Sequence, residues 1–291
     1  MYKRLTGSSF LLISAAIYGL FGIFSRYTNN FPAFSQGWVR YSIILIVISL
    51  SFLFKKATWK KVQKKDIKWF LIWILPASFQ PIVTFIAFNH LPLGIAYFLI
   101  YSTMILGGVI SGKIFFFEKL NPKKILSLVL VFIGLFLIYR SDITLIKNIY
   151  VLLALVSGLL VGFWNTLTKK VSGNYSEFQM MTLDGSSTVI VGLIGSFFLK
   201  ETLPSITDIS SWVWIFVFAL ANIGAGFLLI KGFKYIEAQV GSLIVPTEII
   251  FAAIFGYLFF GEILKINIYL GGFFILIGAL LPAIEFSNKK V

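Results

Sequence analysis

The sequence predicts an all-α integral membrane protein of ten transmembrane helices, built as two inverted five-helix repeats. Three observations lead to this prediction: the composition, a series of ten apolar segments, and an internal repeat. Hydrophobic residues make up 58% of the chain and charged residues only 12%, whereas soluble domains are about one-quarter charged. Only a lipid environment accommodates this much apolar surface, so we expect the chain to lie in a bilayer.

The apolar segments follow one another along the chain and are separated by short charged or turn-rich connections. A span needs about 20 residues, so 291 residues hold about ten spans and no appended module. We therefore expect a single membrane domain over residues 1–291, with repeats at 1–144 and 145–291. The segments are continuous apolar runs, not the alternating pattern of a membrane barrel. The expected helices cover residues 7–26, 34–54, 67–88, 93–116, 122–139, 149–169, 176–199, 209–231, 238–260 and 266–285.

The internal repeat relates residues 97–138 to residues 241–282 without a gap. Fourteen of these 42 positions are identical at an offset of 144, more than shared apolar composition explains. Five spans separate the two copies, and an odd number makes them face opposite sides of the membrane. Inverted repeats of this kind are the plan of many secondary transporters. The identical pairs include Thr103/Thr247, Gly112/Gly256, Glu118/Glu262 and Gly134/Gly278.

The distribution of lysine and arginine fixes the expected orientation. If the amino terminus is cytoplasmic, 19 of the 25 basic residues fall on the inner side, which is the positive-inside signature. We therefore expect a multi-pass plasma-membrane protein with both termini in the cytoplasm. The net charge of +14 resides in these short loops, so it does not indicate a nucleic-acid partner.

Several classes of chemistry lack the residues they need. The chain has no cysteine and a single histidine, His90, which excludes disulfides, thiolate metal sites and histidine clusters. It also has no carboxylate-rich metal motif and no glycine-rich phosphate loop with its lysine. We expect no enzyme activity, no metal and no cofactor, and any transport to be driven by gradients of solute or ions.

Two short segments resemble a known family. Phe-Phe-Phe-Glu-Lys-Leu at residues 115–120 and Phe-Phe-Gly-Glu-Ile-Leu at residues 259–264 follow the fourth and ninth helices. With ten helices in two inverted repeats, the whole chain resembles the drug/metabolite transporter superfamily, EamA-type branch. The resemblance implies a basket of helices 1–4 and 6–9 around a central cavity, helices 5 and 10 at the periphery, and transport by alternating access. It leaves the solute open, because members carry amino acids, nucleosides, choline-like cations, sugar derivatives and drugs. We interpret the recurrent Glu118 and Glu262 as structural residues near the interface.

Glu248 is the first of three charged residues expected inside the membrane. A charge near the bilayer centre is costly, so each should face a cavity or a partner. Glu248 follows Pro246, which lacks an amide donor and loosens the helix where a site would lie. Its counterpart in the first repeat is Met104, so the acid breaks the symmetry of the halves. This asymmetry favours solute recognition or proton coupling, and the alternative is a neutral or paired glutamate that stabilises helix packing.

Asp184 and Arg40 are the other two charged residues expected inside the membrane. They lie at different expected depths, so a direct ion pair requires Arg40 to reach inward. Arg40 otherwise extends toward the lipid headgroups. A buried pair is compatible with either solute binding or architecture.

Neutral polar residues deep in the spans complete the candidate site. Each one can hydrogen-bond a solute or a neighbouring helix. Trp164 stands out because it lies away from the interfacial belt and offers a flat face to an apolar or cationic solute. Pro76 and Pro81 predict a kink in the third helix around Gln80. The candidate solute-binding residues are Tyr18, Gln80, Tyr101, Thr103, Trp164, Asn165, Asn222, Thr247 and Glu248.

Two glycine pairs at helical spacing predict close helix packing. Gly108 and Gly112 share one helix face, and Gly158 and Gly162 share another. Such small-residue faces serve sliding, static packing or a homodimer interface, and all three uses stay open.

We therefore favour a secondary transporter or facilitator for a small cationic or zwitterionic metabolite, such as an amino acid or amine, because the central groups are acids. Proton coupling through Glu248 stays open. One alternative is an anionic or sugar-derived solute, an anion being held by Arg40 and Lys231. Another is a membrane scaffold, which leaves Glu248 unexplained. A transporter needs a cavity that reaches Glu248, whereas a scaffold would bury Glu248 against a neighbouring helix.

Overall fold

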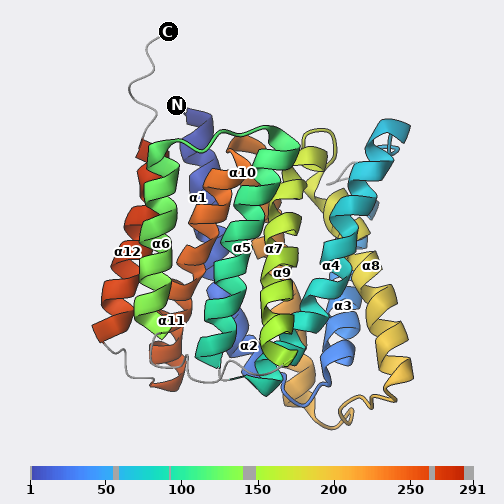
Figure 1. The fold of residues 1–291 in the computed structure, drawn as a ribbon. Helices are drawn as coiled ribbons and strands as arrows, with labels where there is room; N and C mark the ends of the chain where they lie inside the picture. Colours follow the sequence, from blue (N-terminus) through green and yellow to red (C-terminus); the bar gives the residue numbers. More distant parts are fainter. Residues whose placement is uncertain (1, 55–58, 92, 140–148, 262–265, 285–291) are drawn as a thin grey trace.

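The computed structural model describes residues 2–54, 59–91, 93–139, 149–261 and 266–284, and every regular element among them is helical. The helices lie side by side, and α1 begins on the same face on which α12 ends (Figure 1). Their bounds are α1 Tyr2–Gly19, α2 Phe21–Tyr27, α3 Ala33–Leu53, α4 Lys64–His90, α5 Leu93–Phe116, α6 Pro122–Tyr139, α7 Ile149–Ser172, α8 Glu177–Phe198, α9 Ile209–Tyr235, α10 Ala238–Ile244, α11 Glu248–Phe260 and α12 Ile266–Ile284.

These helices match the ten expected spans, with two corrections. The first span is divided between α1 and α2 at Leu20, and the ninth is divided between α10 and α11 by a 3₁₀ turn, Val245–Thr247. The turn contains Pro246, whose missing N–H removes a helical hydrogen bond. With each divided span counted once, eight segments of the described residues are long and apolar enough to cross a membrane. The third span, by contrast, continues as one helix through Pro76 and Pro81.

The packing of the helices has the symmetry of an inverted repeat. Corresponding helices of the two halves pair with each other, α3 with α8 and α6 with α12. Two further contacts are related by the same symmetry. The third helix of each half packs on the first helix of the other, α4 on α7 and α9 on α1. In Figure 1, α1 begins on the upper face and α7 on the lower face, so the two halves have opposite orientations.

Glycines of the repeat form the contact between α6 and α12. A Cβ on Gly134 would lie 2.5 Å from the Gly271 carbonyl oxygen, and one on Gly278 would lie 2.9 Å from that of Ser127. The offset of 144 converts the first contact into the second. The two helices therefore touch backbone to backbone at two equivalent points, which explains why Gly134 and Gly278 are identical in the repeat.

The predicted close approach of Gly158 and Gly162 is confirmed. Both lie against the backbone of α5, and a Cβ on Gly162 would be 2.9 Å from the Gly108 amide nitrogen. Gly108 and Gly112 face Ser242 and Gln239 of α10. All four glycines are thus used within the chain, which leaves none of them to a homodimer interface.

Substitution of Gly271 tests this packing. We expect Gly271→Ala to destabilise the protein by about 1–3 kcal/mol, the usual cost of overpacking, because its Cβ would lie 2.5 Å from the Gly134 carbonyl oxygen. The neighbouring Gly272→Ala is the matched control, since its Cβ would have an ordinary 3.5 Å contact with Ile250. Thermal unfolding in detergent measures both, and equal melting temperatures for the two variants would contradict the assignment.

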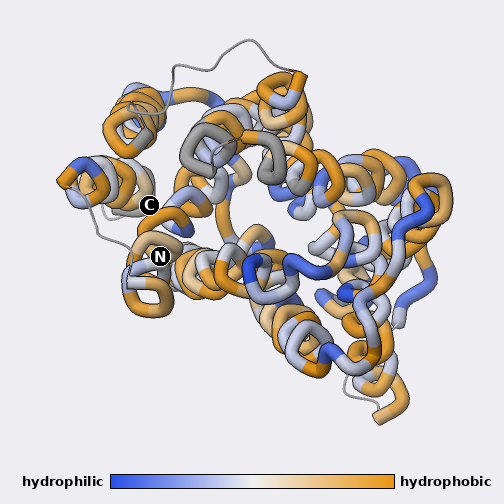
Figure 2. Tube along the Cα trace, turned by 90° about the horizontal axis from the view of Figure 1, so that it is seen from below, coloured by the Kyte–Doolittle hydropathy of each residue, from blue (hydrophilic) through white to orange (hydrophobic). Residues whose placement is uncertain are grey.

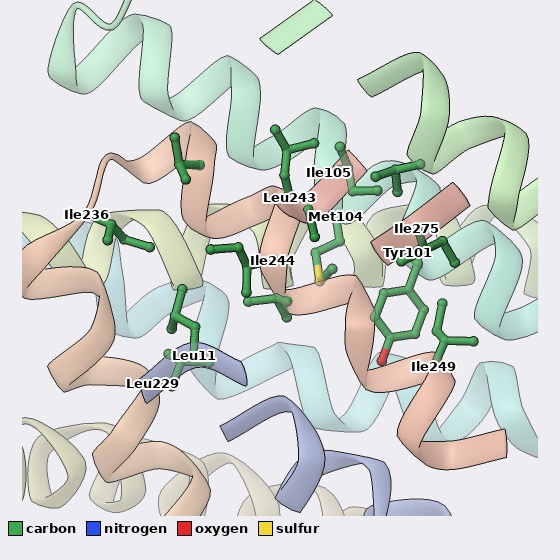
Figure 3. Close-up of a cluster of buried hydrophobic side chains, with 14 of the residues drawn as sticks. Leu11, Tyr101, Met104, Ile105, Leu229, Ile236, Leu243, Ile244, Ile249 and Ile275 are labelled. Carbon is green, nitrogen blue, oxygen red and sulfur yellow. The ribbon is translucent and has the colours of Figure 1, made fainter. Parts of the chain in front are cut away.

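The buried core lies between the two halves. One hydrophobic cluster joins residues of α1, α5, α6, α9, α10, α11 and α12, and a second joins α3, α4, α7, α8 and α9. Figure 3 shows the first cluster, in which Tyr101 and Met104 lie among aliphatic side chains. The Trp164 ring packs against both clusters. Seen end-on in Figure 2, hydrophobic residues also cover much of the periphery, as lipid contact requires.

Candidate functional site

A small cavity lies where the two repeats meet. Its volume is about 20 Å³, which is room for one or two water molecules, so the helices are closed around it. Residues of the first half and of the second half both contribute to the wall, as expected for a site at a repeat interface. The lining residues are Tyr18 of α1, Tyr41 and Ile44 of α3, Trp164 of α7, Met181 and Asp184 of α8, and Asn222, Gly226 and Ile230 of α9.

Asp184 supplies the charged group in this wall. Only 7% of the residue is exposed, and Met181, one turn earlier on α8, lines the same cavity. The next residue, Gly185, makes room for the partner helix, because its Cβ would lie 3.3 Å from the Tyr41 ring. Tyr41 is in turn hydrogen-bonded to Asn222 of α9. Helices α3, α8 and α9 thus hold a carboxyl, a phenol and an amide around one space.

Arg40 lies inside the protein, beside this group. It is 4% exposed, and its guanidinium carbon is 4.2 Å from the centre of the Phe218 ring and 5.3 Å from that of Tyr41. Contacts of this kind stabilise a desolvated cation by about 2 kcal/mol. Of the two alternatives for Arg40, this burial agrees with the one that reaches inward, not with extension to the lipid headgroups.

Tyr18 occupies a central position among the charged groups. It lies within electrostatic range of Glu248, Asp184, Arg40 and Tyr41. Its helix, α1, ends at the next residue, Gly19, where a Cβ would lie 2.9 Å from the Ala252 amide nitrogen. The break after α1 thus lies one residue from a side chain that is within electrostatic range of both candidate acids.

Glu248 is half-buried and begins α11 directly after the 3₁₀ turn. It is hydrogen-bonded to Tyr101, whose ring lies beside Ile249 in Figure 3. Its repeat mate Met104 is 2% exposed in the same cluster. The residues lining the described cavity do not include Glu248, so Glu248 lies outside the wall that contains Asp184.

Trp164 and Asn165 each carry a polar atom that is free to hydrogen-bond a water or solute molecule. The indole nitrogen of Trp164 and the side-chain oxygen of Asn165 are buried without a hydrogen-bond partner among the described residues. The Asn165 nitrogen lies 3.9 Å from the Met104 sulfur. A buried polar group left without a bond costs about 1–3 kcal/mol, so a donor and an acceptor are available here to water or solute.

Three predicted residues make hydrogen bonds within the protein and do not line this cavity. Gln80 donates to Thr84 at 2.7 Å on its own helix. Thr103 donates to the Leu155 carbonyl oxygen of α7 at 2.8 Å, and Thr247 donates to that of Ile244 at 2.8 Å. Their hydroxyls and amide are engaged by the fold in this conformation, and their role in solute binding stays a prediction.

Glu118 has the structural role expected of it, and the contact crosses the repeat. Its two carboxylate oxygens accept hydrogen bonds from the backbone nitrogens of Ala238 (2.8 Å) and Gln239 (2.9 Å). Those are the first residues of α10, whose positive dipole end also favours the acid. Lys169 of α7 lies 3.5 Å away. Glu118 therefore connects the segment after α5 in the first half to the start of α10 in the second. Glu262 lies outside the described residues.

Sequence reasoning missed two residues that shape the cavity, Tyr41 and Met181. Tyr41 follows Arg40 directly, and a tyrosine deep in an apolar span was the available signal. Met181 carries no such signal, because methionine is equally common in packed cores.

Comparison with known proteins agrees with this architecture. The model of the EamA-like transporter family matches twice, at residues 5–140 and 148–283. The chain therefore belongs to the EamA-like transporter family. It is accordingly a multi-pass membrane protein of a transporter family, not an enzyme.

Similar proteins include an uncharacterized transporter of Archaeoglobus fulgidus, 28% identical over 174 residues, which are 60% of this chain and 61% of that protein. The uncharacterized transporter YoaV of Bacillus subtilis is 26% identical over 79% of this chain and 80% of its own length. A solved structure described as "Crystal structure of protein" superimposes with a TM-score of 0.80 at 12% identity, covering 99% of this chain and all of that one. At this identity the match shows the fold alone.

Proposed function

We propose that the chain is a secondary transporter or facilitator that moves a small cationic or zwitterionic metabolite, such as an amino acid or amine, by alternating access. The observation that carries the proposal is a buried carboxyl group, Asp184, facing a closed cavity with the rings of Tyr18, Tyr41 and Trp164. A carboxylate attracts a positive group, and aromatic faces stabilise it once water is removed.

The remaining polar atoms suit a solute with hydrogen-bonding groups. The free indole N–H of Trp164 is a donor for a carboxylate or hydroxyl, and the Asn165 oxygen accepts from an ammonium group. Trp164 lines the cavity, and Asn165 contacts Met104 of α5, so a solute bound there would touch residues of both halves.

Transport would require the closed cavity to open on alternate sides. At about 20 Å³ it is smaller than the several hundred cubic ångströms of organic ligand sites. Opening would separate α1, α3, α7, α8 and α9 on one side at a time. The wall contains residues of both inverted halves, which supports such a rocking movement.

An anionic solute is less well supported. Arg40 packs on Phe218, whereas Lys231 packs on Phe10 and Phe227, the latter at 5.3 Å. Phe218 and Phe227 are nine residues apart on α9, roughly 14 Å along the axis. The two cations therefore occupy separate sites. A scaffold role, in turn, does not account for a buried carboxyl group at a cavity between the halves.

The orientation is part of the proposal. The start of α1 and the end of α12 lie on one face (Figure 1), and the lysine-rich start of α4 is at the same end of the molecule. The positive-inside rule then supports a plasma-membrane protein with cytoplasmic termini.

Uptake by purified protein in liposomes tests the proposal. Vesicles are offered a mixture of labelled amino acids, amines, sugar derivatives and organic anions, and accumulated solutes are identified. We expect saturable uptake of a cationic or zwitterionic solute, and the same solute should raise the melting temperature, since ligand binding stabilises the folded state. Uptake confined to anions or sugars would reject the solute class, and absence of any uptake or thermal shift would favour the scaffold.

A further inference from the structure

A segment that includes the first residues of α4 presents a dense group of positive charges. Between residues 59 and 68 there are five lysines and one acid. All five lysines, at positions 60, 61, 64, 65 and 68, are exposed. The acid, Asp66, is 9% exposed and accepts a hydrogen bond of 2.7 Å from the Tyr175 hydroxyl. The outer surface of this segment is therefore positive.

The backbone that carries these lysines is fixed to the start of α8. The Gln179 side chain accepts from the Lys60 amide at 3.0 Å and donates to the Lys60 carbonyl at 2.6 Å. The Gln63 amide donates to the Tyr175 hydroxyl at 3.0 Å. Gln179 is fully buried. Positive charge placed only to set topology needs no such attachment, so the anchoring points to a surface of defined shape.

Apolar side chains accompany the lysines. Trp59 is 53% exposed, and Leu53 and Phe54 at the end of α3 are 76% and 71% exposed. Exposed tryptophan and phenylalanine beside lysine are typical of segments that lie at the lipid headgroup level. The mixture of charges and rings therefore fits a membrane surface better than a soluble partner.

We propose that residues 59–68 form a binding surface for the phosphate headgroups of anionic lipids. Clusters of four to eight basic residues next to a transmembrane helix attract such headgroups, and the fixed backbone allows several lysines to contact them together. Gln179 belongs to α8, the helix that also carries Met181 and Asp184. A bound headgroup would therefore also stabilise the position of α8 at the cavity. Binding itself does not depend on which solute is transported.

The test compares lipid retention by matched variants. The purified full chain is titrated with phosphatidylglycerol and with phosphatidylcholine in detergent, and bound lipid is counted by native mass spectrometry. The variant K60Q/K61Q/K64Q/K65Q is compared with K3Q/R4Q/K289Q/K290Q, which removes the same charge at the chain ends. We expect the first to lose the preference for phosphatidylglycerol about tenfold or more, and the second to keep it.

A third variant separates the contribution of the fixed backbone from that of the lysine charges. Gln179→Ala keeps every lysine but releases the backbone of Lys60, and we expect a partial loss of the preference. Free inorganic phosphate should not displace the lipid. Equal losses in the two charge variants, or equal binding of both lipids by the wild type, overturns the proposal. The four lysines replaced in the first variant are exposed, so that variant should fold. It therefore tests the proposal even if Gln179→Ala fails to fold.

Discussion

Asp184→Asn is expected to reduce solute uptake on the order of 100-fold. The substitution removes the charge that faces the cavity and keeps the size of the side chain. Loss of one partner from a buried charge pair costs about 2–5 kcal/mol, and 100-fold corresponds to about 2.8 kcal/mol. Initial rates of uptake into proteoliposomes, measured over a range of solute concentrations, show whether the loss is in affinity.

A matched control shows whether the effect is specific to the Asp184 carboxylate or follows the loss of any carboxylate. Asp208 caps α9 outside the span, where it accepts a hydrogen bond from the Ser211 amide at 3.3 Å. Asparagine caps equally well, so Asp208→Asn should keep uptake. Asp184→Asn should also melt no lower than wild type, because it removes a buried charge. Wild-type uptake by Asp184→Asn would exclude Asp184 from solute binding.

Much of the fold was predictable because its signals are local. Span length, the lysine distribution and the offset of 144 are all contained in the sequence, and the family match and the helix packing confirm the ten-helix architecture. The break after Gly19 was not predictable, since a lone glycine is common in membrane helices. It coincides with the backbone of Ala252 approaching from the other half, a contact that no local pattern reveals. The break at Pro246 did have a local signal.

The candidate site was predictable only in part, for a geometric reason. Polar residues deep in apolar spans are recognisable, which is how Tyr18, Trp164, Asn222 and Asp184 were identified. Which way a hydroxyl points around its helix depends on the neighbouring helix. Thr103 therefore bonds to α7 instead of facing the cavity.

The repeat itself indicates which residues serve architecture. Positions that are identical in both halves, such as Gly134 and Gly278, mediate helix contacts. Glu118, identical to Glu262, caps a helix of the opposite half. Where the two halves differ, the symmetry of the fold does not require that residue. Glu248 opposite Met104 is a difference of this kind, so its role is best tested on transport.

Glu248→Gln is expected to abolish accumulation driven by a pH gradient while leaving exchange of solute across the membrane intact. Glu248 is bonded to Tyr101, and Tyr18 is within electrostatic range of both Glu248 and Asp184. Binding of a positive solute near Asp184 would thereby favour release of a proton from Glu248, and glutamine cannot exchange one. Accumulation is measured in vesicles with an imposed pH gradient, and exchange is measured with labelled solute on one side only.

Tyr101→Phe provides the accompanying variant, because it removes the hydrogen bond and keeps the carboxyl group. We expect it to retain gradient-driven accumulation with an altered pH profile, since Glu248 would then exchange its proton without that bond. A structural role for Glu248 predicts instead that both variants lose stability and exchange together. If Glu248→Gln accumulates solute as wild type does at every pH, Glu248 takes no part in coupling, and Asp184 becomes the remaining acid at the cavity able to exchange a proton with the solute.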